Sequence, residues 1–307
     1  MASTRRRARN EGSISSLLSG LVVVDKPAGI TSHDVVARCR RIFGQKRVGH
    51  GGTLDPDATG VLLVGLGHAT RLLRFLSELS KTYTGEIVLG VATSTLDAAG
   101  DVVGEWDMSA VSLEDVRRAA AGLTGEIDQV PPMVSAVKVG GRRLHELARA
   151  GLEVERVARR VTVHRFDVSA TTQPGVVRAG VECSSGTYVR SLAADVGTAL
   201  GGGAHLRNLR RTAVGQFGVD EAVALDSAGP DHVLPPVEAL RGRPRVVVAD
   251  HDVAAIGFGK VLDRTVLGAD GDGPWAVVDA AGRLLAVYEP YDEGRVKPAV
   301  VLPRGDC

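Results

Sequence analysis

The chain has 307 residues, of which 44% are hydrophobic and 24% charged, and its formal net charge is +1. This length can bury a sizeable core and predicts two domains, and the composition indicates a soluble globular protein. No apolar run approaches the roughly 18 residues of a membrane span, and the basic N-terminus lacks the apolar segment of a secretory signal. The cysteines Cys39, Cys183 and Cys307 are far apart, which favours reduced thiols in a cytoplasmic protein.

Predicted elements begin at about residue 20. Residues 1–19 are basic and then rich in Ser and Gly, which is typical of a disordered tail. Val22–Val24 predicts a strand. Thr31 begins a predicted helix, because Asp34 stands where a capping-box partner belongs, and Gly44 ends it. The residues that we expect to face inward from this helix are Val35, Val36, Cys39, Ile42 and Phe43.

A loop of unusual composition follows this helix. Residues 49–60 contain four glycines, a histidine and Pro56. Pro56 fixes its own φ and pushes Asp55 towards an extended backbone, so a sharply turned loop presents a carboxylate. The apolar residues 61–64 predict a buried strand or helix behind the loop. Taken alone, Asp55 could simply cap backbone N–H groups in a turn, and the choice depends on the rest of the chain.

The later elements mix strands and helices without regular βαβ repetition. Strands are predicted at 83–91, 161–170 and 176–183, and helices at 112–123, 142–150 and 187–200. The strands at 161–170 and 176–183 are expected to pair around a Gln-Pro-Gly turn. This mixture predicts an α+β domain on a mixed, largely antiparallel sheet.

A second unit is predicted at the C-terminal end. Proline-rich segments at 234–236 and 242–244 mark a boundary near residue 243. Beyond it the sequence predicts a compact β module of about 60 residues. Its expected strands are Arg245–Ala249, Trp275–Asp279, Leu284–Tyr288 and Lys297–Leu302.

Several segments occur in a distinctive order along the chain. They are residues 21–33 (LVVVDKPAGITSH), 49–60 (GHGGTLDPDATG), 81–85 (KTYTG), 131–138 (PPMVSAVK), 141–151 (GRRLHELARAG) and 183–192 (CSSGTYVRSL). Together they resemble the bacterial TruB family of tRNA pseudouridine synthases. The resemblance implies a pseudouridine synthase catalytic domain at 20–243, with a thumb-like region near 131–151 and a cleft across a curved sheet. It also implies a small PUA-like β domain at 244–307, here short and acidic at 270–272.

The resemblance implies an isomerase that converts uridine to pseudouridine in the T loop of tRNA, at position 55, after the base is flipped out. It implies the tRNA T arm as partner. No metal and no cofactor are expected, because the chain has no cluster with metal-ligand spacing and no cofactor motif. A monomer is expected, because contact with the substrate depends largely on shape and backbone. A non-catalytic RNA-binding or RNA-folding protein on the same scaffold remains the alternative. A small-molecule enzyme is disfavoured, because Gly65-Leu66-Gly67 is too weak for a dinucleotide fingerprint and the chain has no P-loop.

The family motifs assign catalytic roles to three residues. Asp55 matches the nucleophile, which either adds to the uracil ring or traps the sugar cation; the sequence leaves both routes open. Arg190 matches the arginine that pairs with it, since a buried carboxylate needs such a partner to stay ionised. Tyr83 matches the residue that stacks on the base, and it is a candidate acceptor of the C5 proton if its pKa of about 10 is lowered.

Other residues are expected to contact RNA. His50 matches the family histidine that occupies the gap left by the flipped base. Lys26 is either structural or phosphate-facing, and Leu209 is expected to form an apolar wall of the pocket. Arginines that are either phosphate contacts or solvated surface residues are Arg142, Arg143, Arg149, Arg207, Arg210 and Arg211.

Overall fold

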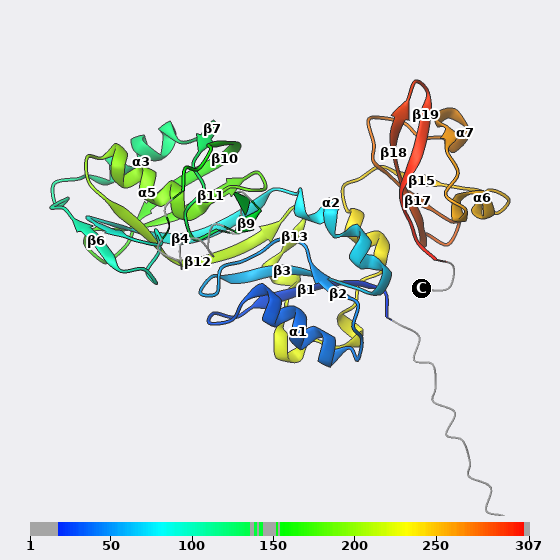
Figure 1. The fold of residues 1–307 in the computed structure, drawn as a ribbon, viewed down its shortest axis with the longest axis horizontal. Helices are drawn as coiled ribbons and strands as arrows, with labels where there is room; N and C mark the ends of the chain where they lie inside the picture. The colour runs from blue at the N-terminus through cyan, green and yellow to red at the C-terminus, as the bar shows by residue number, and fades with distance from the viewer. Residues whose placement is uncertain (1–17, 136–137, 140, 144–151, 153, 304–307) are drawn as a thin grey trace, which may run out of the picture.

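The structure is a computed structural model that describes residues 18–135, 138–139, 141–143, 152 and 154–303. A large mixed sheet spans most of it, and a smaller sheet lies near the C-terminus (Figure 1). The strands of the large sheet are β1 (Gly20–Lys26), β2 (Val48–His50), β3 (Thr59–Leu66), β4 (Lys81–Leu89), β7 (Gly125–Gln129), β10 (Arg159–Ala170), β11 (Val176–Cys183), β12 (Ala204–Val214), β13 (Phe217–Gly218) and β14 (Val223–Ala224).

The large sheet has the order β14-β1-β3-β12-β4-β11-β10-β7, with β2 added on β3 and β13 on β12. Its pairs are antiparallel except for β1 with β14 and β3 with β12. The expected α+β fold on a largely antiparallel sheet is therefore confirmed. The apolar run at 61–64 lies within β3, and the expected hairpin of β10 and β11 is present.

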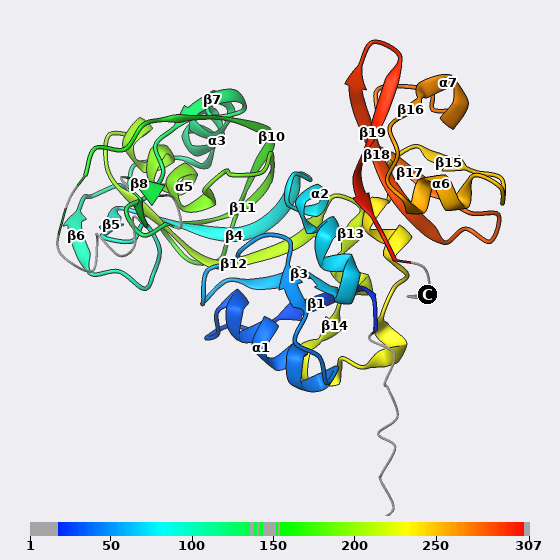
Figure 2. The ribbon, with the colours of Figure 1, turned by 45° about the vertical axis from the view of Figure 1, so that its right-hand side comes forward.

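Helices cover the two halves of this sheet separately (Figures 1 and 2). α1 (Ser32–Ile42) packs against β1 and β3, whereas α3 (Leu113–Gly122) and α5 (Val189–Ala199) pack on the half formed by β4, β10 and β11. Strand β12 pairs with both β3 and β4 and so joins the halves. The N-terminal end of β3 meets β12 at this junction, which places the Asp55 loop (residues 51–58) between the two halves.

Helix α1 forms as its sequence predicts, with one difference. Thr31 is the N-cap, and its side chain and that of Asp34 form the expected capping box. Ile42, expected to face inward, is 38% exposed. It is the last residue of the helix, and the ring of Phe43 packs against the core in its place.

Two further predictions differ from the structure, and one strand was not predicted. The strand expected at 83–91 divides into β4 and β5 (Val91–Thr93), because Gly90 turns the chain with a φ of 85°. β5 pairs with β6 (Val102–Glu105). The helix expected at 142–150 begins instead as β9 (Arg142–Arg143), which pairs with β8 (Lys138–Val139), and residues 144–151 lie outside the described part. Strand β12 was not predicted at all.

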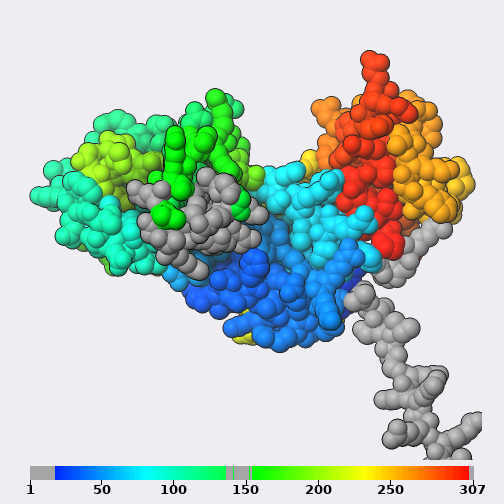
Figure 3. Space-filling model, in the orientation of Figure 1, coloured from blue at the N-terminus to red at the C-terminus, as the bar shows by residue number. Residues whose placement is uncertain are grey.

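The C-terminal sheet contains the four expected strands. It has the order β15-β17-β18-β19-β16. Its elements are β15 (Arg245–Val247), α6 (Val253–Gly257), β16 (Leu262–Asp263), α7 (Arg264–Leu267), β17 (Trp275–Val278), β18 (Leu284–Asp292) and β19 (Arg295–Val301). Figure 3 shows this unit as a lobe beside the larger part of the molecule. We propose the domain boundary at residue 243, between η5 (Pro236–Leu240) and β15, and the PUA-like identity stays a prediction.

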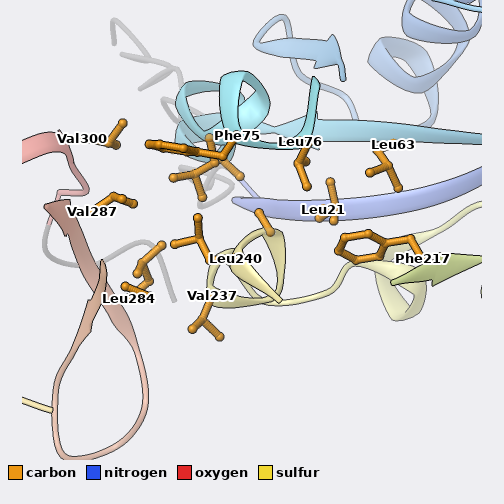
Figure 4. Packing of buried hydrophobic residues seen from close by; sticks show 14 of the residues in the cluster. Leu21, Leu63, Phe75, Leu76, Phe217, Val237, Leu240, Leu284, Val287 and Val300 are labelled. Carbon is orange, nitrogen blue, oxygen red and sulfur yellow. The ribbon is translucent and has the colours of Figure 1, made fainter. Parts of the chain in front are cut away.

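The two sheets share one hydrophobic core. Phe75, in α2 (Leu73–Ser77), lies close to Val300 and Val287 of the C-terminal sheet, and Leu240 of η5 lies beside them (Figure 4). Polar contacts join the same surfaces, since Arg74 forms an ion pair with Glu289 at 3.3 Å. Within the described residues, no helix has the length and apolar character of a membrane span.

Candidate active site

The Asp55 loop connects β2 to β3. Three buried side chains form hydrogen bonds with its backbone. The first is Arg211, which is only 1% exposed. Its Nε donates to the carbonyl of Val61 at 2.7 Å, and its terminal nitrogens donate to the carbonyls of Thr53 and Gly52 at 3.3 and 3.2 Å. The backbone approach is close enough that a Cβ at Gly60, whose φ is 101°, would lie 2.1 Å from the carbonyl oxygen of Arg211.

The second is Lys26, at the end of β1. Its side chain is fully buried, and its Nζ donates to the carbonyls of Pro56 and Pro27 at 2.8 and 2.9 Å. Burial lowers the pKa of Lys26 to about 8, although the nearby carboxylates of Asp57 and Asp55 act in the opposite direction. The structure thus gives Lys26 the structural role that the sequence left open. Its contact with RNA stays a prediction.

The third is Ser32, the first residue of α1. Its hydroxyl accepts a hydrogen bond from the N–H of Leu54 at 2.9 Å and donates one to the carbonyl of Leu54 at 3.2 Å. Leu54 immediately precedes Asp55, so α1 is attached directly to the segment that carries the candidate nucleophile. The sequence analysis quoted this serine within a family segment but assigned it no role.

Arg190 brings two carboxylates together. Its side chain is 5% exposed, and its Nε lies 3.0 Å from Oδ2 of Asp55. One terminal nitrogen also donates to Oδ1 of Asp55 at 3.3 Å and to the carbonyl of Val134 at 3.0 Å. The other lies 3.2 Å from Oδ2 of Asp97 and donates to the carbonyl of Thr95 at 2.9 Å. Such a two-sided arrangement fixes the planar guanidinium and, through it, the carboxylate of Asp55.

The charge state of Asp55 results from opposing effects. Burial raises the pKa of Asp55, the guanidinium of Arg190 lowers it, and the carboxylate of Asp97 raises it. The net direction is upward from the ordinary value of 3.8. Its side chain remains 42% exposed, so the carboxylate is accessible to a ligand. A carboxylate that is partly exposed and oriented by a buried guanidinium is suited to nucleophilic attack or to stabilising a cation.

A cavity of about 280 Å³ opens beside this carboxylate. Asp55 and Arg190 line it, together with Tyr83 and Leu209. Tyr83 is 9% exposed, and Leu209 packs against the same apolar cluster. The cavity therefore combines an acid with an aromatic and an aliphatic wall, which suits a planar base.

Burial raises the pKa of Tyr83, and the neighbouring charge of Arg211 opposes this shift only in part. A tyrosine with a raised pKa is neutral at ordinary pH and is a poor proton acceptor. The raised pKa therefore favours the stacking role expected for Tyr83 over the role of accepting the C5 proton, and both roles stay predictions.

A second cavity of about 240 Å³ also has Asp55 and Arg190 in its lining. Asp97, Val134 and Leu209 contribute to its lining. Asp55 and Arg190 thus line both cavities.

His50, at the end of β2, leads into the Asp55 loop. Its ring makes an edge-on contact with that of His33, with the ring centroids 5.4 Å apart. Burial, together with the charges of His33 and Arg211, lowers the pKa of His50, so the ring is neutral at pH 7. Its Nδ1 is buried and has no hydrogen-bond partner among the residues that the structure describes. Its contact with RNA stays a prediction.

The arginines predicted to bind phosphate have different surroundings. Arg211 is buried under the Asp55 loop and also lines the cavity beside Asp55, and its assignment as a phosphate contact stays a prediction. Arg210 forms a bidentate pair with Asp25, at 3.0 and 2.8 Å, and Arg207 pairs with Glu86 at 2.8 Å. Both side chains therefore already have an anionic partner. Arg142 and Arg143 lie in β9, and Arg149 lies outside the described residues.

Asp97 is the functional candidate that the sequence analysis missed. It lies in a loop between β5 and β6, where Leu96 adopts a φ of 62°. Its Oδ1 accepts hydrogen bonds from Thr95 Oγ1 and the N–H of Ala99 at 2.5 and 3.1 Å, which leaves Oδ2 for Arg190. No periodicity or residue spacing signals this contact. Among the described residues, no cluster of three or more His, Cys, Asp or Glu side chains could hold a metal ion.

Comparisons with known proteins assign this chain to a family. The model of the TruB family pseudouridylate synthase N-terminal domain matches residues 40–189, and that of the tRNA pseudouridylate synthase B C-terminal domain matches residues 190–228. The chain is 48% identical over 290 residues to the tRNA pseudouridine synthase B of Mycobacterium sp. (strain KMS), an alignment that covers 92% of this chain and 96% of the relative. The chain therefore belongs to the TruB family of pseudouridylate synthases.

Other relatives agree with this assignment. The tRNA pseudouridine synthase B of Corynebacterium aurimucosum is 49% identical over 279 residues, which cover 88% of this chain and 92% of the relative. Among solved structures, a Cbf5-Nop10-Gar1 complex contains a chain with a TM-score of 0.69 and 30% identity, covering 88% of this chain and 78% of that one. An H/ACA RNP bound to a substrate RNA containing 2′-deoxyuridine gives a TM-score of 0.69 and 26% identity, covering 93% and 86%.

Proposed function

We propose that this protein is a tRNA pseudouridine synthase that isomerises the uridine at position 55 of the T loop. The observation that carries the proposal is the Asp55 carboxylate, held at 3.0 Å by the buried Arg190 and exposed to a cavity with an aromatic wall. The relatives named tRNA pseudouridine synthase B support the substrate, and the RNA-bound structural relative supports RNA as the ligand.

The proposed reaction breaks the bond between ribose C1′ and uracil N1, rotates the base and forms a bond between C1′ and C5. The proton on C5 then leaves, and N1 gains a proton, so no redox partner is required. Asp55 supplies the carboxylate, either by adding to the ring or by stabilising the sugar cation, and Arg190 orients it. Both routes remain open.

Access to Asp55 requires that the target nucleotide leave the RNA stack. A nucleobase enters a pocket of this kind only after flipping, and the lost stacking is replaced by side-chain contacts. Tyr83 and Leu209 line the cavity and offer those contacts. We propose the tRNA T arm as the partner and a monomer as the active form. Since tRNA is the substrate, we place the protein in the cytoplasm.

The test is single-turnover release of tritium from unmodified tRNA labelled at uridine C5, without added metal or cofactor. Wild-type protein should release tritium, and Asp55→Asn should release none while still binding the tRNA. Asp57→Asn makes the same change of charge at an exposed residue two positions away and should retain activity. Binding without release by the wild-type protein would instead favour a non-catalytic RNA-binding protein. Release by Asp55→Asn would show that another residue is the nucleophile.

A further inference from the structure

The first turn of α1 contains two hydroxyl residues with different tasks. Thr31 caps the helix, since its Oγ1 accepts a hydrogen bond from the N–H of Asp34 at 3.1 Å. In turn, the carboxylate of Asp34 accepts a hydrogen bond from the N–H of Thr31 at 2.8 Å. The next residue, Ser32, is therefore not needed as a cap. It is 1% exposed, and both of its hydrogen bonds are made to the backbone of Leu54.

These two bonds act on the backbone beside Asp55. The carbonyl of Leu54 belongs to the peptide group whose nitrogen is that of Asp55, so the hydroxyl of Ser32 restricts the rotation of that peptide plane. Arg190 holds the carboxylate at the far end of the same residue. Ser32 and Arg190 thus fix the two ends of Asp55, its backbone and its carboxylate.

The support for Ser32 is rigid. Val35, Val36 and Cys39 of α1 are buried in one cluster with Val22 and Leu62 of the sheet. Leu54 belongs to a different cluster, which includes Tyr83 and the helix α5. Ser32 therefore connects the helix on one half of the sheet to the substrate cavity on the other half.

We propose that Ser32 is a positioning residue for the isomerisation, holding the Leu54–Asp55 peptide group so that the Asp55 carboxylate meets the flipped uridine in reactive geometry. This role rests on the proposed function. Displacing a reacting group by about 1 Å can cost on the order of 100-fold in rate. Loss of the hydroxyl would free the peptide plane, whereas Tyr83 and Leu209, which also line the cavity, make no described hydrogen bond to Ser32.

The test compares Ser32→Ala with Thr31→Ala in the full-length protein. Thr31→Ala removes the helix cap next to Ser32 and lowers the melting temperature, but Thr31 makes no described contact with Leu54. We measure the melting temperature, the Kd for unmodified tRNA and the single-turnover rate at saturating protein. Ser32→Ala should lower the rate by about 10-fold to about 100-fold, with a Kd within about twofold of the wild-type value. Thr31→Ala should keep the wild-type rate.

Ser32→Cys provides a second variant of similar size, and it carries the test if Ser32→Ala does not fold. Its thiol is a weaker donor and acceptor than a hydroxyl, so its rate should fall between those of wild type and Ser32→Ala. A wild-type rate in Ser32→Ala, or an equal loss of rate in Thr31→Ala, would overturn the positioning role. Absence of tritium release by the wild-type protein would instead overturn the proposed function, and the role of Ser32 with it.

Discussion

Arg190 contacts two carboxylates, and this arrangement determines how the activity should depend on pH. The pKa of Asp55 lies above its ordinary value of 3.8, because burial outweighs the attraction of Arg190. Only the ionised form of Asp55 can act as a nucleophile. The rate should therefore fall as the pH is lowered through this raised pKa, and the loss should begin at a higher pH than for an ordinary aspartate.

Substitution of Arg190 tests the direction of this effect. In Arg190→Gln the stabilising charge is lost, so the pKa of Asp55 should rise further and the acid limb of the rate profile should move to higher pH. Arg190→Lys keeps the charge but loses the two-sided contact, so its rate should fall with a smaller movement of the limb. Single-turnover rates between about pH 4 and about pH 8 measure both. If Arg190→Gln and Arg190→Lys had the same acid limb, the positive charge at position 190 would not be what lowers the pKa of Asp55.

Substitution of Asp97 should move the acid limb of the rate profile in the opposite direction. Its carboxylate raises the pKa of Asp55, so Asp97→Asn should move the acid limb to lower pH. The same substitution removes a charged partner at 3.2 Å from Arg190, and we expect the rate at neutral pH to fall by about 10-fold because the guanidinium is less well fixed. The profile is measured as for Arg190. If the acid limb of Asp97→Asn moved to higher pH instead, the charge of Asp97 would not be what raises the pKa of Asp55.

The sequence predicted some of these residues and missed others for physical reasons. Asp55 and Arg190 stand in segments that resemble family motifs, so they could be paired although they lie far apart in the chain. Asp97 reaches Arg190 through a local turn in which Leu96 has a positive φ. No pattern of residues in the sequence predicts this turn. Arg211 has the same charge as its neighbours in the sequence, and only the fold decides that it is buried.

At the scale of elements, β12 shows where periodicity fails. The register between β12 and β4 shifts between Arg207 and Arg210, where Asn208 adopts a φ of 53°. An inserted residue of this kind breaks the alternation of inward and outward side chains by which a strand is predicted. Helices α1 and α3 were predicted closely, because capping boxes are local signals that depend on little beyond the helix itself.

The asparagine at position 208 should contribute measurably to the free energy of unfolding, because it tolerates the positive φ at this irregularity. Its Nδ2 donates to Glu86 at 3.0 Å, and its backbone conformation is unfavourable for residues with a Cβ other than Asn and Asp. Asn208→Ala should lower the free energy of unfolding by about 1–2 kcal/mol. Asn208→Gly loses only the hydrogen bond and should cost about 1 kcal/mol or less. Urea unfolding followed by circular dichroism measures both, and a larger loss in the glycine variant would refute this account.

At the scale of the whole molecule, one buried apolar cluster contains residues from both sheets. Residues of the C-terminal sheet, among them Val278, Leu284 and Val300, belong to the same buried cluster as Phe75 and Leu240 from the larger part (Figure 4). Separating the units would expose this apolar surface to water. The boundary proposed at residue 243 separates two sheets that share no strand. Because separating the two units would expose their common apolar cluster, we expect them to unfold together.

Phe75→Ala tests this coupling, with Phe258→Ala as its control. Phe75 is 6% exposed within the shared core, whereas Phe258 is 82% exposed on the C-terminal unit. Truncating a buried phenylalanine costs about 3–5 kcal/mol, so Phe75→Ala should lower the melting temperature of the entire protein, and Phe258→Ala should leave it nearly unchanged. Scanning calorimetry should show one transition in which the calorimetric and van't Hoff enthalpies agree. Two transitions, of which Phe75→Ala moves only one, would show that the sheets unfold independently despite their common core.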